Sequence, residues 1–276
     1  MDDILVVKLG GGLPADPLLD EIAELTAAAT PVVVVHGGGG EADRLAGQLG
    51  RPVRTLLSPD GTRSRRTDED ALDVLAMALL GRVKPALVQG LRSRGVLAAG
   101  LSGADGGLLT AERRPAVRSV ENGRTLLVRD DRSGRITGAR PAVLRALLGE
   151  GIVPVVSPPA ADPSGRLLNV DSDQAAAALA GALGAAALVL LTGVPGVLRD
   201  PADPASVIPE IDCAAPTLAE AGGRMRHKVR AAARARQAGV RRVVIAAAAV
   251  PGPVGAALRG SGTVFTTPSD PERRPA

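Results

Sequence analysis

Short runs of apolar residues alternate with amphipathic stretches along most of the chain. Strands are predicted over residues 4–8, 32–35, 98–101, 153–156, 188–192 and 243–247. Helices are predicted between and around them, near residues 18–28, 41–49, 67–80, 85–94, 141–148, 173–183 and 226–238. Strands that alternate with helices are typical of an α/β fold, in which crossover helices connect the strands of a mainly parallel sheet.

Two segments need separate interpretation. Within residues 116–138, the turn signal Glu121-Asn122-Gly123 separates two β-prone runs, which predicts an antiparallel hairpin outside the main sheet. Residues 175–198 carry no charge and are long enough to cross a membrane. They are rich in alanine and are interrupted by glycine and proline, so we interpret them as a buried helix followed by a buried strand.

Composition excludes several classes of function. The 276 residues are enough for one large α/β domain or two smaller ones. The single cysteine, Cys213, excludes an intrachain disulfide and a cysteine-built zinc site, and two histidines are too few for a histidine-built metal centre. With no Trp, no Tyr and one Phe, aromatic stacking on single-stranded nucleic acid and an aromatic membrane belt are both disfavoured.

The charge pattern favours an enzyme that binds anions. The net charge of +4 comes from 33 Lys and Arg against 29 Asp and Glu, an excess too small and scattered for a protein that binds duplex nucleic acid. Lysine is rare and occurs at Lys8, Lys84 and Lys228. The acidic start Met1-Asp2-Asp3 does not resemble a signal peptide, so we expect a cytoplasmic protein with no membrane or nucleic-acid partner.

Two predicted strands end in glycine-rich turns suited to binding an anion. Lys8 closes the first strand shortly before Gly10-Gly11-Gly12, and His36 closes the second, directly before Gly37-Gly38-Gly39-Gly40 and a helix. Backbone N–H groups of consecutive glycines and of a helix N-terminus converge on anions, and lysine adds a point charge. The alternatives are a flexible turn after Lys8 and a structural hydrogen-bonding role for His36. No P-loop motif is present.

Three later segments carry further candidate residues. The arginines of residues 63–66 form either a clamp on a carboxylate or a solvated loop. A helix is predicted to follow them, and Thr67 is expected to be its N-cap. Asp173 begins a very apolar helix, where a buried carboxylate is costly unless paired, so a lysine is its expected partner. Lys228 opens a basic helix whose arginines are predicted to be solvated, and a retained lysine there indicates a site that needs a compact charge.

Taken together, these segments resemble the amino-acid kinase family, in particular its acetylglutamate kinase branch. The resemblance spans nearly the whole chain and rests on ordered motifs: Val7-Lys8-Leu9-Gly10-Gly11, His36-Gly37-Gly38-Gly39, Arg65-x-Thr67, residues 169–176, residues 191–197 and Met225-x-x-Lys228-Val229. Residues 101–106, residues 116–123 and Gly223-Arg224-Met225 are most similar to the carrier-protein kinases of this branch. Those kinases phosphorylate 2-aminoadipate or glutamate held on a small acidic LysW-type carrier protein.

The resemblance implies an architecture and a set of ligands. The expected fold is a three-layer αβα sandwich of the carbamate kinase-like type, with a mainly parallel central sheet and the β-hairpin as an excursion. Residues 1–166 are expected to bind the amino-acid acceptor and residues 167–276 to bind ATP, with the proline-rich loop 158–165 at the seam. Mg²⁺ is expected to be held mainly by phosphates, with no protein metal ligand. The N-terminal helix of arginine-inhibited hexamers is absent, which favours a homodimer.

The implied reaction transfers a phosphoryl group from MgATP to a side-chain carboxylate and yields an acyl phosphate. The carboxylate is already ionised at pH 7, so no general base is required, and catalysis reduces to alignment and charge neutralisation. By resemblance, the catalytic residues are Lys8 and Lys228, oriented by Asp173. The residues expected to bind ATP are Gly10, Gly11, Thr192, Gly193, Gly196 and Arg224. The residues expected to bind the acceptor are Gly37, Gly38, Gly39, Arg65 and Asn169.

The sequence departs from the family pattern at two places and leaves the acceptor open. Lys84-Pro85 stands where the family usually has Asn-Lys, so we assign Lys84 no role. Ala247-Ala248-Ala249 follows the last predicted strand where a polar Asp-Gly is expected, a change on the nucleotide side. Free N-acetylglutamate, as in arginine biosynthesis, is the alternative to a carrier-bound acceptor. A non-catalytic nucleotide-binding regulator is the alternative from a different class, and the intact Lys8, Asp173 and Lys228 argue against it.

Overall fold

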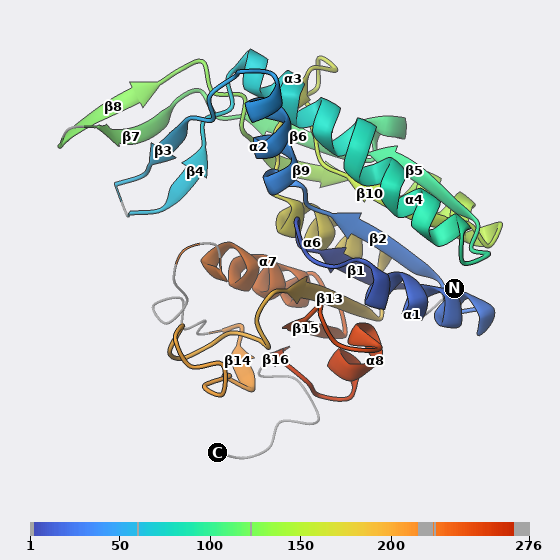
Figure 1. Ribbon diagram of the computed structural model, residues 1–276. Coiled ribbons are helices and arrows are strands. Elements are labelled where there is room, and N and C mark those ends of the chain that lie inside the picture. The colour runs from blue at the N-terminus through green and yellow to red at the C-terminus, as the bar shows by residue number, and fades with distance from the viewer. Residues whose placement is uncertain (1–2, 60, 122, 215–222, 224, 268–276) are drawn as a thin grey trace.

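The protein is built around an eight-stranded sheet (Figure 1). The structure, a computed structural model, describes residues 3–59, 61–121, 123–214, 223 and 225–267. The strand order is β14 (Glu210–Asp212), β16 (Thr263–Thr266), β15 (Arg242–Ala247), β13 (Ala187–Thr192), β1 (Leu5–Leu9), β2 (Val32–His36), β10 (Val153–Ser157) and β5 (Ala98–Ser102). Neighbouring strands run parallel except β15 and β16, which confirms the predicted mainly parallel sheet.

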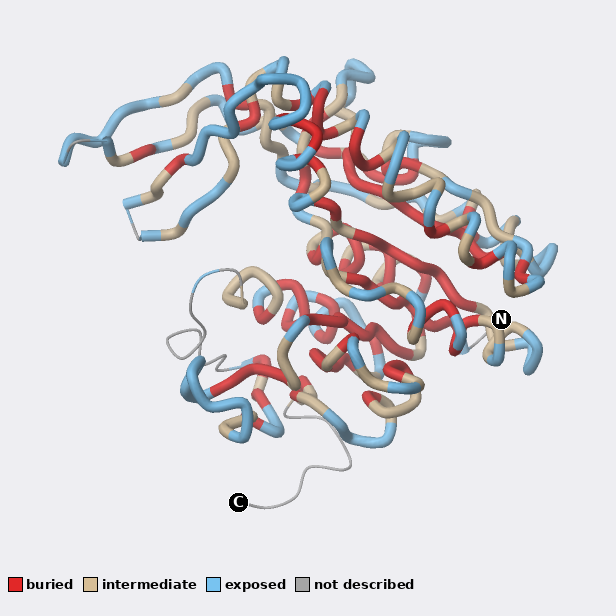
Figure 2. Tube along the Cα trace, viewed as in Figure 1, coloured by how far each residue is buried: buried red, intermediate tan, exposed pale blue. Residues whose placement is uncertain are grey.

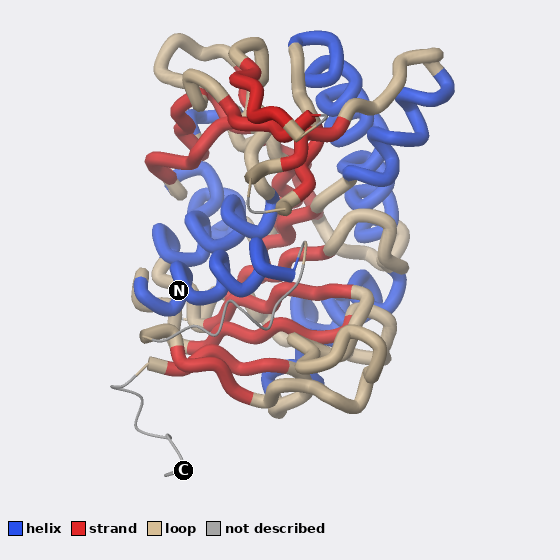
Figure 3. Tube along the Cα trace, turned by 90° about the vertical axis from the view of Figure 1, so that its left-hand side faces the viewer, coloured by secondary structure: helices blue, strands red, loops and turns tan. Residues whose placement is uncertain are grey.

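Helices cover both faces of this sheet, which confirms the three-layer sandwich (Figure 3). One face packs against α1 (Asp16–Ala27), α4 (Lys84–Arg92) and α8 (Pro253–Leu258). The opposite face packs against α5 (Ala142–Gly149), α6 (Ser172–Leu183) and α7 (Met225–Gln237). A smaller apolar cluster joins α2 (Gly39–Gln48) to α3 (Glu69–Ala78), and the π-helical segment η1 (Leu79–Val83) connects α3 to α4.

The central strands are buried on both faces, which explains their nearly continuous apolar sequence (Figure 2). Every residue of β1, β2, β10 and β13 is buried. The uncharged stretch 175–198 forms most of α6 and then β13, which confirms the predicted buried helix and strand. No helix in the described part of the chain is long and apolar enough to span a membrane.

Two hairpins project from the body and form what we call the arm, β3 (Thr55–Leu57) with β4 (Arg63–Arg65) and β7 (Val117–Glu121) with β8 (Arg124–Val128) (Figure 1). The Leu57 backbone N–H donates to the Ser119 hydroxyl at 3.3 Å and ties the hairpins together. The β7–β8 hairpin was predicted, and its turn residue Asn122 lies outside the described residues.

A four-stranded sheet lies between the arm and the main sheet, in the order β12 (Leu167–Leu168), β11 (Ala160–Ala161), β6 (Leu109–Arg113) and β9 (Gly134–Ala139). The 3-10 turn η2 (Asp105–Gly107) precedes β6. The predicted antiparallel excursion over residues 116–138 continues into β9, which pairs antiparallel with β6 and lies outside the main sheet. The main sheet runs without interruption through residues 1–166 and 167–276, because β1 pairs with both β2 and β13. The division into an acceptor half and an ATP half stays a prediction.

Candidate active site

The glycine-rich turns gather at the carboxyl edge of the main sheet. Parallel strands end on the same side, so the residues that follow β1, β2, β13 and β15 lie along one edge, where open α/β sheets bind ligands. Two adjacent strands supply Lys8 and His36, which are buried, with exposed fractions of 3% and 1%. The pairing of Lys8 with Val35 and of Leu9 with His36 places the two glycine turns side by side.

Lys8, Asp173 and Lys228 meet at the centre of this edge. Lys8 Nζ lies 2.7 Å from Asp173 Oδ1, and Lys228 Nζ lies 3.0 Å from each oxygen of the same carboxylate. Alternation along β1 turns Lys8 towards the α6 face of the sheet, opposite Val7 and Leu9. Asp173 stands in the first turn of α6, where Asp171 caps the helix by accepting from the Gln174 N–H at 2.9 Å.

The two lysines keep the buried carboxylate ionised. Burial by itself would raise the pKa of Asp173, but the adjacent charges of Lys8 and Lys228 outweigh it and hold that pKa below its usual range. Burial, together with the charge of Lys8, lowers the pKa of Lys228 to about 8, although Asp173 opposes the change. Two ammonium groups against one carboxylate leave a local positive charge, which suits an anionic ligand.

The glycine turns after β1 and β2 are in direct contact. A Cβ atom on Gly11 would lie 2.8 Å from the Gly38 nitrogen, and one on Gly37 would lie 3.1 Å from the Gly11 nitrogen and 3.3 Å from Ser172 Oγ. No other residue type fits between the two backbones without moving them. The N-termini of α2 and α6 border the same space, so unpaired N–H groups line it from several sides.

The predicted acceptor residues form a second group beside the glycine turns. Arg65 donates to the Gly39 carbonyl oxygen at 2.9 Å and pairs with Asp43. The Asn169 side-chain amide donates to Thr67 Oγ1 at 3.0 Å. The structure thus places Arg65 against the start of α2 and Asn169 against the loop before α3.

The expectation that Thr67 caps α3 was wrong. Asp68 is the N-cap and accepts from the Ala71 N–H at 3.0 Å. Thr67 is fully buried, and its hydroxyl contacts Asn169 and the Arg65 carbonyl oxygen instead. The Thr67 N–H donates to Asp131 at 2.9 Å, so this residue fixes the loop between the arm and α3.

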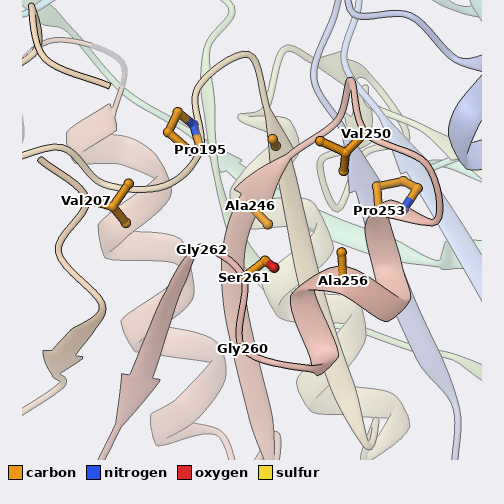
Figure 4. Close-up of a pocket in the computed structure, with 10 residues that line it drawn as sticks. Pro195, Val207, Ala246, Val250, Pro253, Ala256, Gly260, Ser261 and Gly262 are labelled. Atoms are coloured by element: carbon orange, nitrogen blue, oxygen red, sulfur yellow. The ribbon is translucent and has the colours of Figure 1, made fainter. Parts of the chain in front are cut away.

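A pocket of about 500 Å³ lies at the carboxyl ends of β13 and β15, and the described residues predicted to bind ATP are not among those that line it (Figure 4). The residues that line it are Pro195, Val207, Ala246, Ala247, Val250, Pro253, Ala256, Gly260, Ser261 and Gly262. Thr192 ends β13, and its carbonyl oxygen accepts from the Ala248 N–H at 2.9 Å. Of the three alanines at the position of the expected Asp-Gly, Ala247 lines this pocket and adds to its apolar wall.

The glycines predicted to bind ATP are close-packed. Cβ atoms on Gly10 and Gly193 would lie 2.8 Å and 3.4 Å from Leu13 side-chain atoms, and one on Gly196 would lie 2.8 Å from Thr263 Oγ1. Packing accounts for a glycine at Gly196, whose Cβ position is crowded by Thr263 and Val207, whereas at Gly10 the short contact is with the end of the Leu13 side chain, which can move. Arg224 lies outside the described residues.

Sequence reasoning missed two polar residues that shape the site, Ser157 and Glu21. Ser157 ends the buried strand β10 and contacts His36 across the sheet edge. Glu21 on α1 is buried and accepts from the Val254 and Gly255 N–H groups at the start of α8, both at 2.6 Å. A polar residue closing an apolar strand was a visible signal for Ser157. Nothing in the α1 sequence marks Glu21, because its burial depends on the distant helix α8.

Comparison with known proteins identifies the class to which this fold and site belong. Residues 3–247 match the model of the amino acid kinase family, and the chain belongs to that family. The structure superposes on N-acetylglutamate synthase from Neisseria gonorrhoeae with a TM-score of 0.76 and 26% identity, over 98% of this chain and 60% of that one. Carbamate kinase from Giardia lamblia shares the fold, with a TM-score of 0.67 and 16% identity over 96% and 98% of the two chains.

Curated relatives show which members of the family this chain resembles. The [LysW]-aminoadipate kinase of Deinococcus radiodurans is 43% identical over 268 residues, covering 96% of this chain and 92% of the relative. The protein of that name from Thermus thermophilus is 41% identical, covering 95% and 99%. The acetylglutamate kinase of Rubrobacter xylanophilus is 38% identical, covering 94% and 98%. The predicted resemblance to this branch is confirmed.

Proposed function

We propose that this protein is an ATP-dependent kinase that phosphorylates the side-chain carboxylate of 2-aminoadipate or glutamate held through its amino group on a LysW-type carrier protein. The observation that carries the proposal is the contact of Lys8 and Lys228 with one carboxylate beside two glycine turns. The names of the relatives from Deinococcus radiodurans and Thermus thermophilus supply the acceptor class.

The chemistry follows from the charges at this centre. The attacking carboxylate is ionised at neutral pH, so the protein needs to align it with the transferring phosphoryl group and to stabilise negative charge. Lys8 on β1 and Lys228 on α7 supply that stabilisation, and Asp173 holds both ammonium groups in place. Backbone N–H groups of Gly11, Gly38 and Gly39 line the path of the phosphoryl group.

The remaining residues divide between the two substrates. Arg65 and Asn169 hold the acceptor on the side of α2 and α3. The base and ribose of ATP occupy the apolar pocket beside Thr192 and Gly193, whose volume and largely apolar walls suit an aromatic base. The described residues include no cluster of three or more His, Cys, Asp or Glu side chains able to hold a metal. Mg²⁺ is therefore proposed to enter with the phosphates.

The arm is the proposed docking surface for the acidic carrier. Five arginines on and beside the arm are proposed to attract it. Two of them are engaged within the protein: Arg66 pairs with Asp130 at 2.6 Å, and Arg113 donates to the Asp131 carbonyl oxygen at 2.9 Å. Arg63, Arg114 and Arg118 are exposed and make no ion pair within the described part of the chain. These three arginines are therefore the ones proposed to attract the acidic side chains of the carrier. Exposed charges of this kind raise the association rate more than they raise the affinity of the complex.

A hydroxamate assay of acyl phosphate formation tests the function directly. The wild-type protein is supplied with MgATP and with one of three acceptors: aminoadipyl-carrier, glutamyl-carrier or free N-acetylglutamate. We expect a carrier-bound acceptor to give the highest kcat/KM. Preference for free N-acetylglutamate would establish the alternative function, which the relative from Rubrobacter xylanophilus favours. No acyl phosphate with any acceptor would contradict the proposal.

The docking surface has its own test. Replacing Arg63, Arg114 and Arg118 with Glu should raise KM for the carrier-bound acceptor about tenfold or more and leave KM for ATP unchanged. The effect should shrink as salt is raised from about 50 to about 300 mM, because exposed charges are screened over that range. A salt-independent KM in the wild-type protein would rule out steering by these arginines. We further propose that the protein is a homodimer and is located in the cytoplasm. Sedimentation velocity tests the proposed dimer.

A further inference from the structure

The His36 ring lies beneath the glycine turn that follows β2 and contacts it at one end. Nδ1 lies 3.1 Å from the Gly37 carbonyl oxygen, and Nε2 lies 2.5 Å from the Ser157 hydroxyl on β10. The side chain is buried, and it sits on the α4 face of the sheet, the face opposite Lys8. His36 therefore touches the turn from below and does not reach the lysine pair.

These partners determine which ring nitrogen carries the proton. A carbonyl oxygen only accepts, so Nδ1 is the protonated nitrogen and donates to Gly37. Nε2 then accepts the hydrogen of Ser157 Oγ. Burial, reinforced by the charges of Lys84 and Lys8, lowers the pKa of His36 to about 4. The ring is consequently neutral and in one tautomer across the physiological pH range.

The contact with Gly37 orients a single peptide group. In a trans peptide the C=O and N–H bonds point in opposite directions, so a Gly37 carbonyl turned towards His36 turns the Gly38 N–H away from it. That N–H lies beside Gly11, whose Cβ position is 2.8 Å from the Gly38 nitrogen. Among the residues that the structure describes, the Gly38 N–H meets no acceptor. It remains available to a ligand in the space between the two glycine turns.

The peptides on either side are already fixed by other contacts. The Gly37 N–H donates to the Leu9 carbonyl oxygen at 3.0 Å, and the Gly38 carbonyl oxygen accepts from Ala42 at 3.0 Å. The peptide between Gly37 and Gly38 is flanked by two glycines, which rotate their backbone dihedrals at little cost. Within the described part of the chain, the hydrogen bond from His36 is the one that this peptide group makes, and it adds to the backbone contact with Gly11.

We propose that His36 is a positioning residue for phosphoryl transfer: its Nδ1–H holds the Gly37 carbonyl, and this aims the Gly38 N–H at the γ-phosphate of ATP. Ser157 fixes the tautomer and the tilt of the ring that make this possible. The inference rests on the proposed kinase function, but it does not depend on which acceptor is phosphorylated. It assigns a role in the reaction to a side chain that never touches substrate.

A pair of amide variants separates this role from simple structural support. In His36→Asn the side-chain NH₂ takes the place of Nδ1–H and still donates to Gly37. In His36→Gln the amide reaches the position of Nε2, so it contacts Ser157 and leaves the Gly37 carbonyl without its donor. Both variants bury a neutral amide of similar polarity on the same strand. Val34→Ala, two residues upstream on the same face of β2, is the matched control for loss of stability alone.

Nucleotide binding by calorimetry and kcat under saturating substrates are the measurements. ADP lacks the γ-phosphate, so its Kd should stay within about twofold of wild type in all variants, whereas the Kd of the β,γ-imido analogue of ATP should rise about fivefold or more in His36→Gln. The kcat of His36→Gln should fall about 10- to 100-fold, less than the loss of a whole transition-state donor. His36→Asn should recover most of both losses, and Val34→Ala should show neither.

Three results would overturn the inference. His36→Asn as impaired as His36→Gln would show that the donor to Gly37 is not what matters. Equal weakening of ADP and of the imido analogue would indicate a general effect on the fold. If the wild-type protein bound neither nucleotide, the kinase function itself would fail and this inference with it. If instead the wild-type protein binds nucleotide but phosphorylates no carrier-bound acceptor, only the proposed acceptor fails, and the comparison of the two amides still decides the role of His36.

Discussion

Lys8 Nζ and Lys228 Nζ lie 2.7 Å and 3.0 Å from the same oxygen atom, Asp173 Oδ1, although the two lysines are far apart along the chain. One carboxylate thus fixes two ammonium groups, and the pair retains one uncompensated positive charge. A site of this kind binds groups of high negative charge, and the charge is preorganised before substrate arrives.

Removing either ammonium group should abolish most of the activity without unfolding the protein. We expect Lys8→Ala and Lys228→Ala each to lower kcat by at least about 10²–10³, the typical loss on removing one group that stabilises transition-state charge. Lys84→Ala is the matched control, since this third lysine packs its stem against Gly100 of β5 and makes no ion pair within the described residues. Turnover like wild type in either of the first two variants would refute their assignment.

The activity should decline at a lower pH than is usual for an enzyme that depends on lysine. Burial, reinforced by Lys8, lowers the pKa of Lys228 to about 8, and the charged form is the one proposed to bind phosphoryl oxygens. In the free enzyme, kcat/KM should therefore fall above about pH 8 rather than above about pH 10. Lys228→Arg stays charged, so its profile should be flat through this range even though its maximum is lower. A wild-type profile that stays flat to about pH 10 would contradict the prediction.

Stability should fall in mildly acidic solution because of His36. Its pKa is about 4 in the folded protein and about 6.5 in the unfolded chain, so between these values the unfolded state binds more protons. The free energy of unfolding should drop by about 2 kcal/mol from this group between about pH 7 and about pH 5. Urea denaturation of wild type and His36→Asn at both values isolates the contribution. A stability difference between the two proteins that does not change with pH would disprove it.

The buried carboxylate of Glu21 should stabilise one wall of the apolar pocket that is proposed to bind ATP. Glu21→Ala leaves the Val254 and Gly255 N–H groups at the start of α8 without their acceptor, at an expected cost of about 2–4 kcal/mol in the free energy of unfolding. Because α8 supplies Pro253 and Ala256 to the pocket, KM for ATP should rise as well. Glu24→Ala, at an exposed position on the same helix, should change neither quantity. Denaturation and steady-state kinetics of both variants provide the check.

Features encoded by local pattern could be predicted from the sequence. The buried strands are continuous apolar runs, and in a parallel sheet their ends fall at one edge, so the pattern alone predicts that the glycine turns after Lys8 and after His36 lie at the same edge of the sheet. The juxtaposition of Asp173 with a lysine followed from the cost of burying an unpaired carboxylate. In both cases a general rule, the shared edge of parallel strands or the cost of burying an unpaired charge, allows few positions for these residues.

Features that depend on distant packing could not be predicted. The strand β4 consists of Arg63-Ser64-Arg65, which has no apolar pattern, and its hairpin with β3 is held by the contact of Leu57 with Ser119, a residue distant in sequence. The capping of α3 by Asp68 arises because Thr67 is occupied by Asn169, a residue distant in sequence. Glu21 is buried only because α8 returns to cover it. Such contacts are set by the topology rather than by the residues next to them in sequence.

The position of β1 in the middle of the sheet has a consequence for how the protein is made. β1 can pair with β2 as soon as residue 36 has left the ribosome. The other edge of β1 can pair only after β13, residues 187–192, has been synthesised. During that interval the nascent polypeptide presents one unpaired edge of a mostly apolar strand to the cell, the kind of edge that chaperones shield from aggregation. The proposed active centre is accordingly complete only after α7 has been translated, when Lys228 can join Asp173 and Lys8.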